Sequence, residues 1–422
     1  MKLVLLSSNY PPHFEGGTER VVRAQARELA ALGHEVSIVA GAEFLHRGED
    51  VERTEVDGLP VAFIPRLDSE HFDIDYARPR IVDLVLKETD GADWVHVHHW
   101  FPTGVELVRP LSQHHSVAIT FHDLFATCPR FFRSSVVAGL GCPDRGDFEP
   151  CLECVASDIP DGRSEDQLRS NFVARARAFD AEVRAANCLI APSQSHARRV
   201  AQLFGLKREQ LEVVQHGLCE SIERAPRQST WDGSRPLRVL HPGHRTSSKG
   251  TRDLVEALAA LPAGQVELVL AGSEVEAGFD AELAKAAAGL KLQLRPKYAQ
   301  SELGELFGSA DLVALPSRAI ESYGLVLDEA HATGLPVWVS DRGALPERVN
   351  GAGRVLPAED PGAWTKAFEE LLREPAEYAR ELAALPETMP TAEQAAIRLT
   401  ELYSAHTSRS EKNGKNSTNE KT

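Results

Sequence analysis

The sequence predicts an α/β protein made of two doubly wound domains, each built on a parallel sheet. Short apolar segments alternate with helical patterns along most of the chain, which is typical of buried parallel strands joined by crossover helices. The length of 422 residues exceeds what one hydrophobic core commonly supports, so two or three domains are expected. A polar segment broken by proline and glycine, 223–236, separates the two alternating regions and is predicted to be a linker.

Composition and charge narrow the function classes. Apolar residues make up 42% and charged residues 26% of the chain, both ordinary values for a globular protein. The formal net charge of −16 argues against a nucleic-acid partner and leaves at most peripheral contact with an anionic membrane. The apolar run at the N-terminus is too short for a signal peptide, and no apolar stretch is long enough to span a membrane. We therefore expect a cytoplasmic protein with reduced cysteines.

The first domain is predicted to span residues 1–222 and to begin with a buried strand, 2–8. A loop ending in Gly16 and Gly17 follows, then a helix, and then a second strand at 35–40. Strand, glycine loop, helix and strand is the opening of a doubly wound domain. Glycine lets a backbone approach a ligand closely, so Gly17 is a candidate binding residue, and a tight turn that merely needs glycine is the alternative.

Histidines follow two further strands of this domain. His122 comes directly after one of them, at a carboxyl end, where open α/β sheets bind ligands. A solvated loop histidine is the alternative. His96, His98 and His99 suit core, surface or acceptor contacts, and their spacing is too weak a signal for a metal site. The additional strands are expected at 61–64, 95–98, 117–121 and 188–191.

Four cysteines lie in an insertion, 128–154, that is rich in glycine and proline. A loop of this length without regular structure needs a staple. Four thiolates that include one C-x2-C pair suit a tetrahedral structural zinc ion, whereas disulfides, an iron–sulfur cluster and free cysteines are the alternatives. The cysteines are Cys128, Cys142, Cys151 and Cys154.

The second domain is predicted to span 237–385 and to begin with a strand at 237–240. The loop that follows, H-P-G-H-R-T-S-S-K-G, contains Gly243, Arg245 and Lys249. Arginine offers a planar fork to phosphate oxygens and lysine a compact charge, so this loop is a candidate phosphate site. A solvated surface loop is the alternative.

A βαβ unit at 310–336 forms the centre of the second domain. Its strand leads into a loop with Glu321 and Ser322, and Gly324 precedes a helix that carries Glu329. The free N–H groups at a helix start attract phosphate, and here two carboxylates flank them. A buried strand–helix unit with solvated acids is the alternative.

Together these motifs resemble those of the retaining glycosyltransferases of family 4, which have the glycosyltransferase B fold. The most specific match is E-S-Y-G-L-V-L-D-E-A followed by A-x-G-x-P-V, in which seven residues separate Glu321 from Glu329. The loop around Lys249 looks like the family's G-R-x-x-x-x-K-G loop, and T-F-H-D at His122 and the glycine loop at Gly17 resemble further family segments. The resemblance covers about residues 1–404 and implies two Rossmann-like domains that face each other across a cleft.

The resemblance also implies roles for individual residues. Glu329 would accept hydrogen bonds from the ribose of a nucleotide-sugar donor, and Arg245 and Lys249 would hold its diphosphate. Glu321 would contact the sugar and steady positive charge at its anomeric carbon, and His122 would face the same sugar. Because the two basic residues can neutralise the leaving group, no catalytic metal is expected. The other residues implied in donor binding are Gly17, Gly243, Ser322, Tyr323, Gly324 and Leu325.

The activity implied is transfer of a hexose-like sugar to a hydroxyl group of a glycan, a lipid-linked acceptor or a small molecule. A nucleotide-sugar epimerase of the same fold and a non-catalytic nucleotide-sugar-binding protein are the alternatives. The joint presence of Arg245, Lys249, Glu321 and Glu329 favours the transferase. These motifs do not specify the sugar, the base or the acceptor.

The end of the chain is expected to return to the first domain. The segment 386–405 is predicted to form a C-terminal helix that crosses back to it. From His406 onward the sequence has no apolar residue, so 406–422 is predicted to be a disordered tail.

Overall fold

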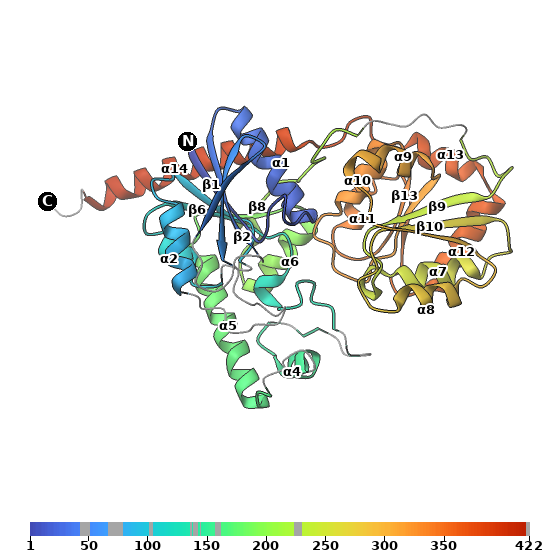
Figure 1. Ribbon diagram of the computed structural model, residues 1–422, viewed down its shortest axis with the longest axis horizontal. Coiled ribbons are helices and arrows are strands. Elements are labelled where there is room, and N and C mark those ends of the chain that lie inside the picture. The colour runs from blue at the N-terminus through green and yellow to red at the C-terminus, as the bar shows by residue number, and fades with distance from the viewer. Residues whose placement is uncertain are drawn as a thin grey trace. The chain divides into compact units, whose positions relative to one another are not determined.

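The computed structural model describes residues 1–42, 51–65, 79–100, 104–135, 137, 142–143, 145–156, 162–222 and 230–418, with side chains as far as residue 407. Parts of the predicted cysteine insertion (136, 138–141, 144), linker (223–229) and tail (419–422) lie outside the described residues. The chain divides into two compact units, Met1–Cys219 with Thr391–Thr422, and Glu220–Pro390. Each unit is a largely parallel sheet covered by helices, so the predicted fold class is confirmed (Figure 1).

The first unit contains an eight-stranded sheet in the order β3-β4-β2-β1-β5-β6-β7-β8. All neighbouring strands pair in parallel except β3 and β4, which form an antiparallel pair at one edge. The order reverses between β1 and β5, whose carboxyl ends therefore form a switch point of the kind where open α/β sheets bind ligands. The strands are β1 (Lys2–Ser7), β2 (Glu35–Ala42), β3 (Glu52–Val56), β4 (Leu59–Pro65), β5 (Trp94–Val97), β6 (Ser116–Thr120), β7 (Cys188–Ala191) and β8 (Leu211–Val213).

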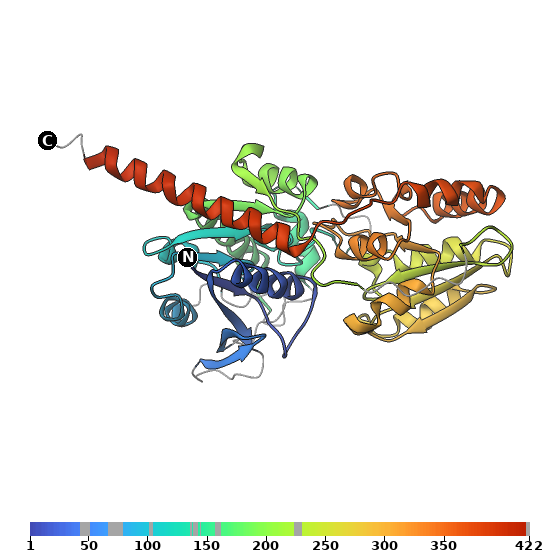
Figure 2. The same cartoon turned by 90° about the horizontal axis from the view of Figure 1, so that it is seen from above.

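The C-terminal helix α14 (Ala392–Thr418) belongs to the first unit and packs against α1 (Gly17–Ala31) (Figure 2). Leu399, Leu402 and Tyr403 of α14 lie in one core with strands β1 and β2. The helix continues as far as Thr418, into the segment predicted to be disordered, because extending an existing helix by one residue is far easier than starting one. No helix in the described part of the chain has the length and apolar character needed to cross a membrane.

The remaining helices of this unit are α2 (Pro79–Glu88), α3 (Val108–Leu111), α4 (Glu149–Ala156), α5 (Glu165–Ala185) and α6 (Gln194–Phe204), with short turns η1 (Phe125–Thr127) and η2 (Arg208–Gln210).

The second unit contains a six-stranded, all-parallel sheet in the order β11-β10-β9-β12-β13-β14. This is the Rossmann order, in which the first and fourth strands are neighbours, so its switch point lies at the carboxyl ends of β9 and β12. The strands are β9 (Leu237–Pro242), β10 (Val266–Ala271), β11 (Lys291–Arg295), β12 (Leu312–Leu315), β13 (Val337–Ser340) and β14 (Val355–Leu356). The helices are α7 (Thr251–Ala259), α8 (Phe279–Ala286), α9 (Leu303–Gly308), α10 (Leu325–Ala332), α11 (Leu345–Arg348), α12 (Pro361–Arg373) and α13 (Ala376–Ala383), with turns η3 (Ser247–Lys249) and η4 (Gln300–Glu302).

Two separate apolar clusters cover the two faces of the second sheet. Neighbouring residues of one strand belong to different clusters, as Val239 and Leu240 of β9 do, because successive side chains of a strand point to opposite faces. Trp231 belongs to one of these clusters, stacks edge-on against Tyr378 and is 2% exposed. The described part of the predicted linker, 230–236, is therefore packed into the second unit.

Candidate functional site

Two loops meet at the switch point of the second unit. The loop after β9 contains Ser248, whose carbonyl accepts hydrogen bonds from the backbone N–H groups of Arg318 and Ala319 in the loop after β12, at 2.9 and 3.0 Å. Gly250 makes this contact possible, because a Cβ atom there would lie 2.0 Å from the carbonyl oxygen of Pro316, at a φ of +67°. The two loops are thus fixed against each other by their backbones.

This contact brings together two residues that the sequence predicts to act on one ligand. The Lys249 Nζ donates to Glu321 Oε1 at 2.6 Å, and the Ser317 hydroxyl donates to the same oxygen at 2.9 Å. Burial raises the pKa of Glu321, but the charge of Lys249 and these two hydrogen bonds outweigh burial and hold the pKa below its usual value. Glu321 is therefore ionised and paired with Lys249 in the absence of a ligand.

The backbone of Glu321 is held by the turn after β13. The Ala344 N–H donates to the Glu321 carbonyl at 2.8 Å. Gly343 has a φ of +63°, and a Cβ atom there would lie 2.2 Å from the same carbonyl oxygen, so only glycine fits without displacing Glu321. The site prediction missed both Gly343 and Ser317. Glycine and proline in the segment D-R-G-A-L-P-E favour a turn, but nothing in the sequence says which residue that turn contacts.

Helix α10 begins directly after Gly324, beside this pair. Gly324 is the N-cap with a φ of +89°, and a Cβ atom there would lie 2.6 Å from a methyl carbon of Leu345. The Tyr323 side chain points into the core, where its hydroxyl donates to Asp328 Oδ2 at 2.8 Å and its ring lies under the guanidinium of Arg348. Tyr323 can thus offer a ligand its backbone but not its side chain. Ser322 and Leu325 flank this helix start, and Glu329 is a buried residue of the same helix.

Arg245 of the predicted phosphate loop is held by protein groups. Its Nε and Nη2 donate to the two carboxylate oxygens of Asp280 at 2.5 and 2.7 Å. Its Nη1 donates to the carbonyls of Gly272 and Arg295, the latter at 2.9 Å. The side chain is only 6% exposed, so the guanidinium is turned into the protein. Arg245 therefore braces the loop against the ends of β10 and β11. Gly272 permits the tight backbone packing there, because a Cβ atom on it would lie 1.9 Å from the carbonyl oxygen of Gly243, which itself has a φ of +124°.

His122 lies in the first unit, just beyond the carboxyl end of β6, inside a group of buried histidines. The His122 Nε2 and His98 Nδ1 are 2.9 Å apart and share one proton in a hydrogen bond, and the ring of His216 stacks on His122 at 4.9 Å. Burial lowers the pKa of His122 and His98, and the neighbouring histidines lower it further, so both rings are neutral. His122 is 8% exposed.

The other histidines of this segment have structural partners. His96 is bound on both ring nitrogens, to Thr120 Oγ1 at 2.8 Å and to the Tyr403 hydroxyl at 2.7 Å. His99 lies 3.2 Å from a carboxylate oxygen of Asp123. They connect strands β5 and β6 to each other and to α14. Gly17 is the first residue of α1, following β1 at the switch point of this unit.

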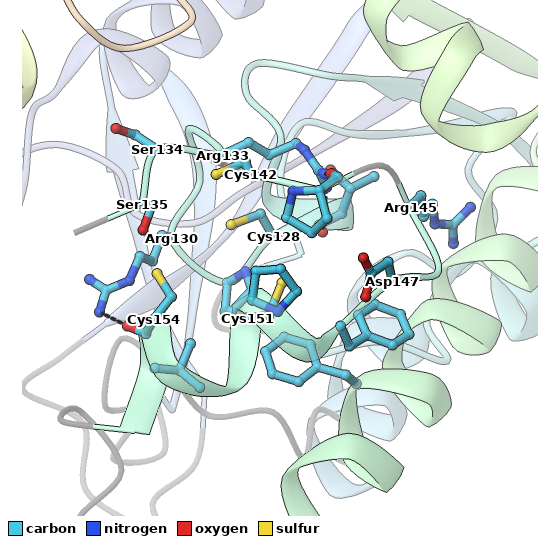
Figure 3. Close-up of a pocket in the computed structure, with 17 residues that line it drawn as sticks. Cys128, Arg130, Arg133, Ser134, Ser135, Cys142, Arg145, Asp147, Cys151 and Cys154 are labelled. Carbon is cyan, nitrogen blue, oxygen red and sulfur yellow. Dashed lines mark hydrogen bonds between the residues drawn. The ribbon is translucent and has the colours of Figure 1, made fainter. Parts of the chain in front are cut away.

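The four cysteines of the predicted metal site all line one pocket in the first unit, without converging on one point (Figure 3). Within the described residues no group of three or more histidine, cysteine or acidic side chains is placed to hold a metal ion, so the structure gives the predicted zinc site no preformed ligand set. Burial and the other cysteines raise the pKa of the Cys151 thiol to about 12, which keeps it protonated. None of the four forms a disulfide, so all are thiols: Cys128, Cys142, Cys151 and Cys154.

Both halves of the chain match family models. Residues 15–219 match the model described as Glycosyltransferase Family 4, and residues 236–374 match the model described as Glycosyl transferases group 1. The D-inositol 3-phosphate glycosyltransferase of Mycobacterium tuberculosis (strain H37Rv) is 31% identical over 201 residues, which are 44% of this chain and 41% of the relative. The chain thus spans about two fifths of the length of the curated relatives it matches.

Solved structures share the whole architecture. Sucrose-phosphate synthase from Thermosynechococcus elongatus superposes with a TM-score of 0.67 at 20% identity, covering 97% of this chain and 99% of that one. WaaG, a glycosyltransferase involved in lipopolysaccharide biosynthesis, gives a TM-score of 0.60 at 18% identity, over 93% and 98% of the two chains. Anabaena Alr3699/HepE in complex with UDP-glucose gives 0.59 at 17% identity, over 98% and 100%. At these identities the likeness shows the fold, which is the predicted glycosyltransferase B fold.

Proposed function

Because the chain belongs to glycosyltransferase family 4, we propose that it transfers a sugar from a nucleotide-sugar donor to a hydroxyl group of an acceptor, with retention of configuration. The observation that carries the proposal is the Lys249–Glu321 pair at the switch point of the second unit, next to the start of α10. A cation, a carboxylate and helix N–H groups in one place suit a substrate whose diphosphate and sugar meet there. The Anabaena protein, which has the same fold, forms a complex with the nucleotide-sugar UDP-glucose, and this supports a donor of that class.

In this proposal the diphosphate lies at the amino end of α10. Lys249 provides a compact positive charge, and the backbone N–H groups of Gly324 and Leu325 provide donors that no carbonyl of the helix can satisfy. Glycine at 324 lets the phosphate approach the backbone without a side chain in the way. Glu329, over one turn into the helix, is proposed to accept hydrogen bonds from the ribose hydroxyls.

Glu321 is proposed to act on the sugar. As the bond between the anomeric carbon and the phosphate oxygen breaks, positive charge grows on the sugar and negative charge on the departing phosphate. An ionised Glu321 stabilises the first, and Lys249, released from Glu321, stabilises the second. The acceptor oxygen attacks the anomeric carbon from the same face, and its proton passes to the departing phosphate oxygen. His122, neutral and therefore able to donate or accept a hydrogen bond, is proposed as a further contact of the sugar.

A structural zinc ion at the four thiols stays a separate proposal. It is supported by the lining of one pocket by all four cysteines and by the C-x2-C pair, which places Cys151 and Cys154 one turn apart on α4. Zinc binding would require the thiols to move together and lose their protons, so uptake should fall steeply below neutral pH. Elemental analysis of protein purified without added metal decides the matter, and far less than one zinc per chain would overturn it.

The function is tested by binding and turnover with purified protein. UDP-, GDP-, ADP- and TDP-sugars are first compared for thermal stabilisation, and the donor found is then used for transfer and donor hydrolysis. Lys249→Ala is expected to weaken donor binding and slow turnover by roughly tenfold to a hundredfold, the effect of losing one charge-assisted hydrogen bond. Lys291→Ala is the matched control, because Lys291 forms a similar ion pair, 2.7 Å from Glu267, on the exposed surface of β10 and β11. Equal effects of both variants would contradict the assignment.

A further inference from the structure

Two neighbouring strands of the first unit hold His98 and His122 next to each other. His98 is the residue after β5, and its backbone N–H donates to the carbonyl of Leu6 in β1 at 2.9 Å. His122 lies just beyond β6, which pairs with β5 in parallel. Earlier on the same two strands, His96 bonds to Thr120 with the same separation of 24 residues. Strand pairing therefore brings His98 Nδ1 to 2.9 Å from His122 Nε2.

Only one proton lies between these two nitrogens. Burial lowers the pKa of both rings, and neighbouring histidines lower it further, so each ring is neutral. A neutral imidazole carries one N–H and one bare nitrogen, so one ring must donate and the other must accept. If His98 donates from Nδ1, the proton of His122 sits on its Nδ1. If His122 donates from Nε2, its Nδ1 is bare.

The second nitrogen of His98 distinguishes the two arrangements. His98 is completely buried, and its Nε2 has no hydrogen-bond partner in the described chain. If His122 donated, His98 would have to carry its own proton on Nε2, as a buried N–H without an acceptor. Native proteins avoid a buried N–H of this kind more consistently than a buried acceptor without a donor. The proton of His98 is therefore favoured on Nδ1, from which it is donated to His122.

The second nitrogen of His122 has a different environment. The ring of His216 stacks on His122 at 4.9 Å, so a ligand can reach His122 only where the ring is left uncovered. The Nδ1 of His122 has no hydrogen bond within the described residues, and unlike the Nε2 of His98 it is not completely buried. A ring nitrogen beyond the carboxyl end of a parallel strand is well placed to meet a ligand.

We propose that His98 is a positioning residue that holds His122 as a hydrogen-bond donor, with the proton of His122 on Nδ1. This rests on the proposed function, in which His122 contacts the sugar, and it specifies what that contact does. The Nδ1–H of His122 donates to a sugar oxygen. Because Nδ1 then has no free lone pair, His122 cannot take the proton of the acceptor, which agrees with its transfer to the departing phosphate oxygen.

Nitrogen-15 NMR of protein with labelled histidine rings measures the two tautomers directly, at pH 8 and without a ligand. The two rings are assigned by the absence of their signals from His98→Asn and His122→Asn. We expect both rings to be neutral, with a protonated Nδ1 and a bare Nε2. A protonated Nε2 on His122 of the wild type, in a neutral ring or in a cation, would overturn the inference.

A matched pair of variants tests the effect on turnover at the same pH. His98→Asn keeps a side-chain N–H near the place of Nδ1, whereas His98→Asp has almost the same shape but only accepts. It therefore draws the proton of His122 to Nε2, as the same NMR experiment should show. With the nucleotide-sugar that best stabilises the protein, His98→Asn should turn over within about threefold of the wild type. His98→Asp should be slower than His98→Asn by roughly threefold to tenfold, the effect of losing one neutral hydrogen bond.

Equal turnover of these two variants, in proteins that unfold at the same temperature, would remove the role of the tautomer and overturn the inference. Failure of the proposed function looks different. In that case the wild type neither binds nor hydrolyses any nucleotide-sugar, whereas the NMR spectra still report which nitrogen of His122 carries the proton.

Discussion

Glu321→Gln is expected to tighten the binding of the nucleoside diphosphate product while it slows sugar transfer. In the free protein Lys249 is held by Glu321 at 2.6 Å, so a phosphate must compete with a carboxylate for the same ammonium group. Glutamine keeps the shape of the side chain and an oxygen that accepts from Lys249 and Ser317, but it removes the negative charge. The side chain at position 321 then competes less with the phosphate for Lys249. It also no longer repels the incoming phosphate by its negative charge.

The size of the effect follows from the exposure of the pair. Two unit charges about 4 Å apart attract by about 1 kcal/mol in water and by about 4 kcal/mol at an effective dielectric constant near 20. The side chain of Lys249 is 34% exposed and that of Glu321 is 18% exposed, which places the pair between these limits. We therefore expect the diphosphate to bind more tightly by about 1–2 kcal/mol, or about 5–30-fold. Turnover should fall by about a hundredfold or more, because the lost charge acts in the transition state.

The assay compares the wild type, Glu321→Gln, Lys249→Ala and the double variant by calorimetry with the nucleoside diphosphate and by transfer kinetics. If Lys249 is the partner that Glu321 restrains, the gain from Glu321→Gln should largely vanish in the Lys249→Ala background, apart from the direct repulsion between Glu321 and the phosphate. Thermal unfolding confirms that each variant is folded. Weaker or unchanged binding of the diphosphate to a folded Glu321→Gln protein would refute the reasoning.

Three further predictions concern residues that support the structure of the second unit. Gly343→Ala should destabilise the second unit by about 1–3 kcal/mol and slow transfer, because a φ of +63° and the closeness of Glu321 exclude a side chain, and thermal unfolding with kinetics measures both. Arg245→Lys should lower thermal stability, because lysine cannot make the paired contacts to Asp280. Its donor affinity should change less than that of Lys249→Ala. A larger loss of donor affinity in Arg245→Lys than in Lys249→Ala would identify Arg245 as a ligand of the donor. Burial raises the pKa of Asp311, but the contacts with two arginines outweigh burial, so the pKa in the folded protein is lowered. The contribution of Asp311 to stability is therefore present above about pH 4 and is lost as pH falls through the pKa of the folded state. Asp311→Asn should therefore be less stable than the wild type near pH 7, with the difference shrinking in acid unfolding experiments below about pH 4.

Local patterns sufficed for the fold, and the resemblance to family 4 motifs singled out Lys249 and Glu321. Apolar segments and glycine-rich turns mark both parallel sheets, and the Rossmann order then brings the loops of Lys249 and Glu321 to one switch point. The orientation of Arg245 could not be foreseen, because it depends on Asp280, which lies 35 residues away in sequence, and on carbonyls of two other strands. A motif fixes which residue types are present, but the partner that binds each side chain comes from another part of the chain.

The same limit explains the histidines and the tail. The sequence left core, surface and acceptor contacts open for His96 and His98. Their burial is decided by strand pairing and, for His96, by Tyr403, which lies more than 300 residues further along the chain. The contact between Gly343 and Glu321 likewise joins two different loops, and no local pattern predicts it. The helix beyond residue 406 was missed because apolar content predicts packing, and an established helix continues without it.

The return of α14 to the first unit has a consequence for how the protein is made. The second unit is one continuous stretch, Glu220–Pro390, and can complete its core as soon as it leaves the ribosome. The first unit is synthesised earlier but contains Leu399, Leu402 and Tyr403, which are translated only after the whole second unit. Until they arrive, the apolar face of α1 is uncovered in the nascent chain, and His96 lacks its hydrogen bond to Tyr403. Ribosomes that stall or terminate before codon 391 therefore release a chain whose later half is folded and whose earlier half is not, a natural substrate for chaperones and proteases.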